Sequence, residues 1–492
     1  MKNHSAQKAG NALFWQSIQM VGVKVIYLVR IFVLARLLLP DDFGLVAIAT
    51  TATGFLFSIT NFGMIPALVQ GNNMNDANYD AAWTLDLFRS FFLSLVTIAT
   101  APFIAALFAE PRAVPIIMAI AIQPFIESTT SIKVVTLNRN LTFRPLAVLR
   151  ITEAIVNTTL SISLAGSLGF WALVVGAIGG TISIVIVSYL LAPYQPRLLF
   201  DREAIKPLIN FGKWIFATNL IALTGSYILR IMITRQFGPA GLGIYFLATQ
   251  LAFLPSDVAS EAVGAVAFPL FARLQNDVQQ ATRVFRALFN GLAAVLYPVC
   301  ALIIVFAPSL TREVLGPNWA GTEQLIRILA LVVMIGIFGE AAVSLFKGFG
   351  QPYRITLLEV VQTSVTIVLA WILTKRFGLA GAALAWLPSV AMSQILSAFF
   401  LQSILYQPFR ELQKPLTAVL VAMGSCTVMA TAFRNLVPGV SGLIMATALG
   451  MASAITLLWL ADRRYKLGFA DNFVLAFPQF ASFLRLIQSE PE

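Results

Sequence analysis

Long apolar runs separated by short polar loops recur along the whole chain. Each run holds about 20 residues or more, which is enough for a helix that crosses roughly 30 Å of hydrocarbon. The loops leave no room for a soluble domain. The pattern therefore predicts an all-α, polytopic membrane protein with about 14 transmembrane helices. Their expected positions are 13–38, 44–69, 81–108, 114–137, 146–166, 170–193, 213–236, 242–270, 285–307, 324–346, 355–374, 379–405, 416–433 and 441–461.

The chain repeats itself at an offset of 199 residues. Repeated halves in so apolar a chain are typical of transporters built from two similar lobes. Each repeat is expected to hold six spans, so both halves enter the membrane from the same side and the repeat is parallel. The matching residues are Asn11, Trp15, Arg36, Pro40, Gly44, Ala49 and Thr50 in the first half and Asn210, Trp214, Arg235, Pro239, Gly243, Ala248 and Thr249 in the second.

This repeat predicts two pseudo-symmetric six-helix lobes followed by two C-terminal helices. Between the lobes, apolar and charged residues alternate with a helical period, which is typical of an amphipathic segment on a membrane surface. The expected domains are an N-terminal lobe at 1–196, a cytoplasmic amphipathic linker at 197–212, a C-terminal lobe at 213–406, helices 13 and 14 at 407–465, and a cytoplasmic tail at 466–492.

Composition and charge support a membrane protein. Hydrophobic residues make up 58% of the chain and charged residues 11%, against about 25% charged in soluble domains. The net charge of +11 is spread over many short loops, which favours anionic lipid headgroups over nucleic acid as its partner. Because Lys and Arg gather on the side of the termini, both termini are expected in the cytoplasm. One loop on that side, 70–80, carries no cation.

Charged residues inside the predicted spans are the candidates for function. A charge near the centre of such a helix costs about 2.5–3.5 kcal/mol on insertion scales, so it usually faces a cavity or a partner. The charged residues inside the spans of the first lobe are mostly cationic. These residues are Lys24, Arg30, Asp86, Arg89, Glu127, Lys133, Arg150, Glu153, Arg230, Asp257, Glu261, Arg327, Glu340 and Glu359.

Arg30 and Arg230 occupy nearly matching positions in the two repeats, one residue out of register. Two arginines that face one central cavity could hold a diphosphate through forked, charge-assisted hydrogen bonds. Lys24 is a further candidate for the same role. The alternative is that each cation pairs with a nearby carboxylate and serves packing alone.

Several other charges favour a structural interpretation. Asp86 with Arg89, and Arg150 with Glu153, have the i,i+3 spacing of ion pairs on one helix face. Arg89 nevertheless remains a candidate for binding the same anion. Lys133 and Arg150 lie near span ends, where long cationic side chains extend to the membrane surface.

Asp257 and Glu261 are spaced i,i+4 and put two carboxylates on one helix face, just after Pro255. Such a pair could take up a proton or Na⁺, because like charges disfavour ionisation of both groups. In the alternative interpretation, Pro255 and Asp257 mark a helix end near water and only Glu261 is buried.

The sequence lacks the motifs of several classes of protein. The chain has no GxxxxGK[ST] phosphate loop, so we do not expect it to hydrolyse ATP. His4 is its only histidine, and Cys300 and Cys426 fall inside predicted spans, so neither a metal centre nor a disulfide is expected. We therefore expect no cofactor beyond Na⁺ or proton coupling.

Residues 33–70, VLARLLLPDDFGLVAIATTATGFLFSITNFGMIPALVQ, resemble the Wzx-type polysaccharide flippases. These belong to the multidrug/oligosaccharidyl-lipid/polysaccharide exporter superfamily, and the resemblance is strongest to the branch that includes colanic acid exporters. FGKW at 211–214, AFPLFARLQND at 267–277 and GPNW at 316–319 also match. The 70–80 loop departs from relatives that usually carry basic residues there.

The resemblance implies two lobes that form a V around a central cavity and rock between inward-facing and outward-facing states. It implies translocation of undecaprenyl-diphosphate-linked oligosaccharide repeat units across the bacterial cytoplasmic membrane, for exopolysaccharide or O-antigen synthesis. Such a protein is a secondary transporter and not an enzyme. The implied partners are this glycan lipid, the membrane lipids, and the polysaccharide polymerase and chain-length machinery; the protein itself is expected to be a monomer.

Two alternatives share the fold: a lipid II flippase and a multidrug/cation antiporter. A cavity for cationic drugs should be acidic, whereas the first lobe is basic. A membrane polysaccharide polymerase or ligase is the least favoured function, because it would need a large outer loop with catalytic residues.

Overall fold

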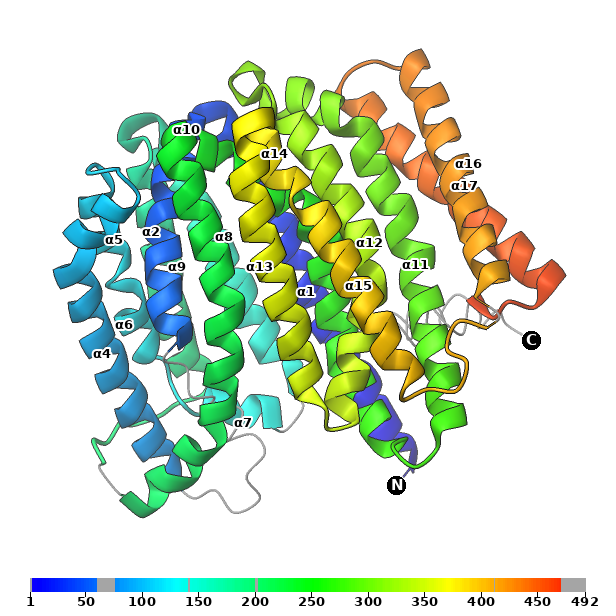
Figure 1. Ribbon diagram of the computed structural model, residues 1–492. Helices are drawn as coiled ribbons and strands as arrows, with labels where there is room; N and C mark the ends of the chain where they lie inside the picture. Colours follow the sequence, from blue (N-terminus) through cyan, green and yellow to red (C-terminus); the bar gives the residue numbers. More distant parts are fainter. Residues whose placement is uncertain (1, 60–75, 140–141, 200–201, 411, 470–492) are drawn as a thin grey trace. The chain divides into compact units, whose positions relative to one another are not determined.

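The computed structural model describes residues 2–59, 76–139, 142–199, 202–410 and 412–469 (Figure 1). These residues form helices and connecting turns, and no strand occurs among them. The chain divides into two compact units, Met1–Ile244 and Tyr245–Glu492. The all-α prediction is therefore confirmed. The predicted lobes divide elsewhere, at 197–212, and that division stays a prediction.

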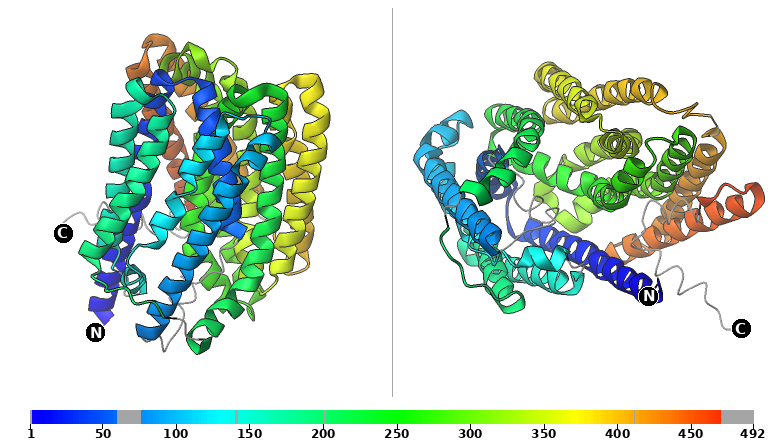
Figure 2. Two further views of the ribbon diagram at one scale, coloured as in Figure 1. Left: turned by 90° about the vertical axis from the view of Figure 1, so that its left-hand side faces the viewer. Right: turned by 90° about the horizontal axis from the view of Figure 1, so that it is seen from below.

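In the first unit, α1 packs on α8, α8 lies beside α9, and α2 and α4 pack on the short α5 (Figure 2). α6 contacts both α4 and α9. The bounds are α1 Lys2–Leu37, α2 Pro40–Ile59, α4 Asp76–Leu107, α5 Ala113–Ile120, α6 Gln123–Ser128, α7 Val134–Arg139, α8 Phe143–Leu168 and α9 Trp171–Leu191.

The fourth predicted span, 114–137, is not one continuous helix but the three short helices α5, α6 and α7. α6 carries Pro124 in its first turn. A proline has no backbone N–H and clashes with the preceding helical turn, so it starts a helix more readily than it continues one. This explains the break between α5 and α6.

The long helix α10, Arg202–Arg273, joins the two predicted spans 213–236 and 242–270. They meet at Gly238, whose φ of 69° and ψ of −178° are not helical. Glycine adopts such a positive φ without steric cost. The predicted break between these spans is therefore present as a sharp kink.

Beside this kink, the two repeats touch at equivalent positions. A β-carbon added to Gly44 would lie 1.8 Å from the carbonyl oxygen of Pro239, and one added to Gly243 would lie 1.9 Å from the carbonyl oxygen of Pro40. The two contacts are reciprocal, as expected across a two-fold axis. The contact therefore supports the parallel repeat predicted from the sequence.

In the second unit, α11 packs against α12 and α16, and α12 and α13 both pack against α15. α16 and α17 form a hairpin, drawn in orange and red (Figure 1). The bounds are α11 Val278–Ser309, η1 Leu310–Leu315, η2 Pro317–Trp319, α12 Thr322–Gly348, α13 Pro352–Phe377, α14 Leu379–Leu384, α15 Trp386–Gln402, α16 Gln413–Leu436 and α17 Val440–Tyr465. Cys300 and Cys426 are buried in this unit as free thiols.

Among the described residues, eleven helices are long and apolar enough to cross a membrane. The difference from about 14 has three sources. α10 contains two spans, the fourth span is broken, and the second span, 44–69, lies partly outside the described residues. Large apolar side chains such as Leu190 (74% exposed), Ile395 (72%) and Leu436 (77%) lie on the surface of these helices, where lipid would cover them.

Three predicted surface segments are described only in part. α10 begins at Arg202, within the predicted linker, but side chains 201–223 lie outside the described residues. The same holds for 70–75 of the cation-free loop and for most of the tail. Residues 76–80 are not a loop but the start of α4, where Asp76 forms an ion pair with Lys133 and Asp80 accepts a hydrogen bond from the Tyr194 hydroxyl at 2.6 Å. Lys133 therefore places a cation beside the described end of this cation-free stretch.

Candidate functional site

Arg30 on α1 is the centre of a polar network inside the first unit. Its Nη1 donates to Oδ1 of Asn157 on α8 at 2.5 Å, and its guanidinium carbon lies 4.7 Å from the centroid of the Tyr27 ring. The Tyr27 hydroxyl donates to Oε1 of Glu153 at 2.5 Å. Arg30 Nε is buried and has no hydrogen-bond partner among the described residues. The network therefore contains a cation whose buried Nε–H is unused among the described residues.

The local sequence of α8 explains this arrangement. Glu153 and Asn157 are four residues apart, so both lie on one helix face. Behind them, α9 approaches closely, because a β-carbon on Gly180 would lie 3.1 Å from Glu153 Oε1. The missing side chain of Gly180 thus leaves the room that the Glu153 carboxylate occupies.

Arg230 on α10 lies against α2. Its Nη1 donates to Thr51 Oγ1 at 2.7 Å. One turn earlier, the ring of Tyr227 packs edge-on against Phe55, with 4.4 Å between the ring centroids. Arg30 and Arg230 thus contact different helices, and a shared cavity between them stays a prediction.

The other predicted anion-binding residues differ in their surroundings. Arg89 forms an ion pair with Asp86 at 2.6 Å, which confirms the predicted i,i+3 pair, and lies 5.4 Å from the ring centroid of Phe57. Lys24 on α1 is half-buried, and no hydrogen bond or ion pair of its side chain occurs within the described ranges. Asp86 therefore partly neutralises the charge of Arg89, whereas no carboxylate pairs with Lys24 among the described residues.

Two structural expectations have different outcomes. Lys133 forms the ion pair with Asp76 and lies 4.8 Å from the ring centroid of Tyr79, so its structural role is confirmed. The predicted Arg150–Glu153 ion pair is wrong, since no such pair occurs in the described part of the chain. Glu153 instead bonds to Tyr27 because α8 turns its carboxylate towards α1.

Asp257 and Glu261 are both exposed on α10. The helix runs through Pro255 and continues to Arg273, so the alternative of a helix end with a buried Glu261 is wrong. A proline inside a membrane helix removes one backbone hydrogen bond, and the surrounding helix can tolerate this loss. The role of the two carboxylates in ion coupling is untested and stays a prediction.

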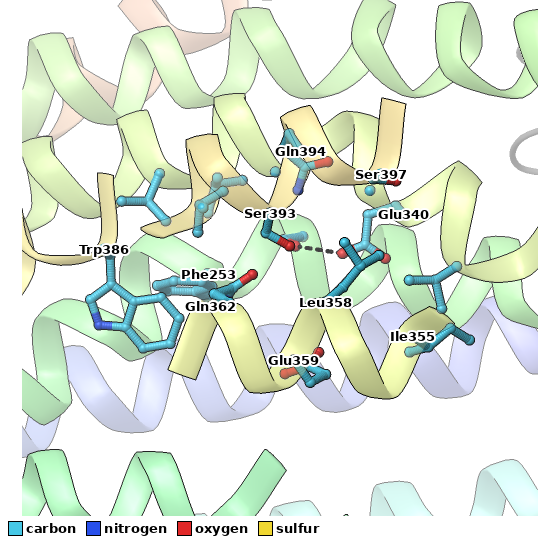
Figure 3. A pocket seen from close by; sticks show the side chains of 17 residues that line it. Phe253, Glu340, Ile355, Leu358, Glu359, Gln362, Trp386, Ser393, Gln394 and Ser397 are labelled. Carbon is cyan, nitrogen blue, oxygen red and sulfur yellow. Dashed lines mark hydrogen bonds between the residues drawn. The ribbon is translucent and has the colours of Figure 1, made fainter. Parts of the chain in front are cut away.

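The second unit contains a pocket of about 190 Å³ between α10, α12, α13 and α15 (Figure 3). Glu340 on α12 lines it and accepts hydrogen bonds from Ser260 at 2.6 Å and from Ser256 at 3.4 Å. Glu359 on α13 also lines it. The two carboxyl groups that line this interior pocket thus come from α12 and α13, whereas the predicted pair, Asp257 and Glu261, lies on the exposed surface of α10.

This pocket could not be found from the sequence, because its residues come from four helices. Glu340 and Glu359 were recognisable as charges inside predicted spans, but nothing in the spacing joins them. The only local signal is Ser256 with Ser260, an i,i+4 pair of hydroxyl residues on the same helix as Asp257.

Comparisons with known proteins agree on one family. Residues 33–324 match the model of a family described as "Polysaccharide biosynthesis protein". The teichuronic acid biosynthesis protein TuaB of Bacillus subtilis is 24% identical over 421 residues, which cover 80% of this chain and 85% of TuaB. The lipopolysaccharide biosynthesis protein WzxC of Escherichia coli is 21% identical, covering 81% and 82%. The succinoglycan biosynthesis transport protein ExoT of Rhizobium meliloti is 22% identical, covering 68% of each chain.

Solved structures share the fold. The lipid II flippase MurJ in an inward closed conformation superposes with a TM-score of 0.74 at 13% identity, covering 91% of this chain and 98% of MurJ. A multidrug resistance MATE transporter in an inward-facing conformation superposes with a TM-score of 0.54 at 19% identity, covering 80% and 97%. At these identities the likeness establishes the architecture alone.

Proposed function

Because this chain belongs to the polysaccharide biosynthesis protein family, we propose that it flips undecaprenyl-diphosphate-linked oligosaccharide repeat units across the cytoplasmic membrane. It is a multi-pass membrane protein and a transporter, not an enzyme. The names of WzxC and ExoT, a lipopolysaccharide biosynthesis protein and a succinoglycan transport protein, support a glycan as the cargo. Both termini then face the cytoplasm, where the cargo is made.

The unused donor of Arg30 is the observation that carries this proposal. A buried charged group without its full set of partners is costly in a membrane protein. Asn157 holds one end of the guanidinium, and Nε remains for an anion. Arginine binds phosphate through two parallel hydrogen bonds, so the diphosphate of a lipid-linked glycan suits this group.

Arg230 and Lys24 supply further positive charge for the diphosphate, and Arg89 contributes less because Asp86 shares its charge. The prenyl tail can remain in lipid while the charged headgroup crosses. An interior-negative potential favours outward movement of an anion by roughly 2.3 kcal/mol per charge per 100 mV. Return of a cation through Asp257 and Glu261 then resets the carrier by alternating access.

The test is a flipping assay in proteoliposomes with undecaprenyl-diphosphate-linked oligosaccharide. We expect Arg30→Gln to lower the rate by about 10-fold or more, since a hydrogen bond to a charged group is worth about 1.5–3 kcal/mol. Arg30→Lys should flip faster than Arg30→Gln but slower than wild type, because lysine keeps the positive charge but lacks the forked N–H donors of the guanidinium. Arg376→Gln, at the exposed end of α13, is the matched control. Wild-type rates with folded Arg30→Gln protein would refute the proposal.

The same assay separates the two related functions. Lipid II carries the same diphosphate but a different headgroup, and a cationic dye carries the opposite charge. We expect transport of the glycan lipid to exceed that of both. Faster transport of lipid II, or dye export that survives Arg30→Gln, would favour the lipid II flippase or the multidrug antiporter instead.

A further inference from the structure

We propose that the pocket between α10, α12, α13 and α15 binds one sugar ring of the transported glycan. This inference rests on the proposed function, because it assigns a place to the sugar part of the same cargo. Under this proposal the cations of the first unit bind the diphosphate and the pocket recognises the carbohydrate.

The polar groups of the pocket have the chemistry of a sugar site. Glu359 and Gln362 come from α13, Gln394 from α15 and Glu340 from α12 (Figure 3). Carboxylate and amide groups are planar and can each bond two neighbouring hydroxyls. Groups of this kind, converging from different helices on a small cavity, fix the orientation of a polar ligand.

Two buried atoms in the pocket have unused hydrogen-bonding capacity. Gln394 Oε1 and Ser397 Oγ have no hydrogen-bond partner among the described residues. Ser397 is only 1% exposed, and its side chain lines the cavity. Buried polar groups are almost always paired with protein or water, so these two atoms point to a ligand. A sugar hydroxyl can donate to the amide oxygen, and a second can bond the serine.

One wall of the pocket is aromatic. The rings of Trp386 and Phe253 pack edge to face, with their centroids 6.1 Å apart. The indole Nε1–H of Trp386 donates to the Tyr245 hydroxyl at 3.0 Å, which fixes the orientation of the ring. The face of an aromatic ring is electronegative and attracts the weakly positive C–H groups on one side of a pyranose. The wall therefore offers the apolar contact that sugar sites need beside their hydrogen bonds.

Size and charge favour a sugar over a metal ion or a phosphate. A cavity needs only about 10–15 Å³ to hold one water molecule, so a volume of about 190 Å³ suits one sugar ring and exceeds what a bare ion fills. Both oxygens of Glu340 already accept serine hydroxyls. No Lys or Arg from the described part of the chain lines the pocket, so it offers no cation for the diphosphate and suits the neutral part of the cargo.

Gly339 on α12 makes room for the amide of Gln394. A β-carbon at this position would lie 2.8 Å from Gln394 Nε2. Gly339→Ala therefore displaces the amide without removing it. This gives a second variant that tests the same group independently.

The experiment uses the full-length protein in lipid nanodiscs and three free sugars as probes: D-glucose, D-galactose and N-acetyl-D-glucosamine. Saturation-transfer NMR measures their binding. We expect at least one sugar to bind, and its affinity to fall about 10-fold or more in Gln394→Leu and in Gly339→Ala, because a site built for hydroxyls loses a partner. Gln402→Leu, at the exposed end of the same helix, is the matched control and should leave the affinity unchanged.

Three results would overturn the proposal. In the first, none of the three sugars binds to the wild-type protein. In the second, sugar binding is the same in Gln394→Leu and Gly339→Ala as in wild type, with melting temperatures showing that the variants are folded. In the third, radioactive Na⁺ binds, is lost in Glu340→Gln and is not displaced by sugar, which would make the pocket a cation site.

The sugar probes carry no lipid and no phosphate, so their failure leaves the proposed function intact. That function is tested separately with sugar-free undecaprenyl diphosphate and Arg30→Gln. If sugars bind but Arg30→Gln leaves the affinity for undecaprenyl diphosphate unchanged, only the proposed role of the first unit is refuted.

Discussion

The carbonyl oxygen of Pro40 occupies the space that a side chain at Gly243 would need. A β-carbon there would lie 1.9 Å from this oxygen, far inside van der Waals contact. The equivalent pair, Gly44 and Pro239, makes the same contact in return. Two stretches of backbone therefore touch directly, and only glycine permits this at either position.

Gly243→Ala should separate these backbones. A methyl group cannot fit without a backbone shift, and overpacking of this kind typically costs about 1–3 kcal/mol. We expect a lower melting temperature in detergent and slower flipping in proteoliposomes. Gly44→Ala should behave alike, because its surroundings are equivalent.

Gly424→Ala on α16 is the control, since no atom lies within 4 Å of the added carbon. Alanine is favoured over glycine inside a helix by roughly 0.5–1 kcal/mol, so this variant should be as stable as wild type or slightly more stable. Equal melting temperatures for Gly243→Ala and Gly424→Ala would contradict the close contact.

Tyr27→Phe should weaken diphosphate binding without removing any cation. It keeps the ring beside Arg30 but removes the hydroxyl that donates to Glu153. The carboxylate is then free to pair with the guanidinium and to compete with the anion. We expect an affinity for undecaprenyl diphosphate lower by about tenfold, or ~1.4 kcal/mol.

The double variant Tyr27→Phe with Glu153→Gln should restore most of that affinity, because the competing charge is gone. Titration of both proteins with undecaprenyl diphosphate measures the difference. If the double variant binds as weakly as Tyr27→Phe alone, competition by Glu153 is not the cause.

Asp257 and Glu261 are predicted to couple transport to a cation. We expect Asp257→Asn with Glu261→Gln to abolish the stimulation of flipping by an imposed Na⁺ or proton gradient while leaving slow, gradient-independent flipping. Each gradient is imposed alone across proteoliposomes. If the wild-type protein responds to neither gradient, flipping is not coupled to Na⁺ or protons. If the response survives in the double variant, residues other than Asp257 and Glu261 bind the coupling ion.

Acid should weaken the ion pairs that Arg112, in the loop between α4 and α5, makes with Glu110 of the same loop and with Asp41 at the start of α2. Arg112 donates from Nε to Glu110 at 2.7 Å and from Nη1 to Asp41 at 2.9 Å. The Arg112 guanidinium lowers the pKa of Glu110 below its ordinary value. A lowered folded-state pKa means that the stabilisation is complete above the unfolded pKa of about 4.3 and is lost as the pH falls through the lowered value.

Melting temperatures in detergent between pH 6 and pH 3 test this. The wild type should lose stability more steeply towards the acid end than Glu110→Gln, which has no proton to take up at this position. Because Arg112 is largely exposed, the difference should be small, about 1 kcal/mol or less. If the melting temperatures of the two proteins fall in parallel with pH, the Glu110–Arg112 ion pair does not contribute to stability.

Helix positions could be predicted because each apolar run has to cross the same thickness of hydrocarbon. The course of the backbone within a run depends on single residues: Pro124 divides the fourth span, whereas Pro255 does not interrupt α10. The break at Gly238 was predicted as a gap between two spans, whereas the contact at Gly44 was recognisable only because this residue is repeated as Gly243. Sequence spacing does not report which neighbouring helix packs against a residue.

The same limit applies to the candidate sites. Asp86 with Arg89 follows from spacing along one helix, and so the ion pair was predictable. Glu153 instead accepts a hydrogen bond from Tyr27 on another helix and does not pair with Arg150 on its own helix. The pocket around Glu340 draws on four helices, and no local pattern brings them together.

Cys300 and Cys426 are enclosed by the packed helices of the second unit, with relative exposures of 0%. Hydrophilic maleimides react with accessible thiolates and should leave both residues unmodified. A single cysteine placed on any exposed loop would then be labelled selectively in the otherwise native chain. The side of the membrane on which each loop lies can therefore be mapped without first removing the natural thiols.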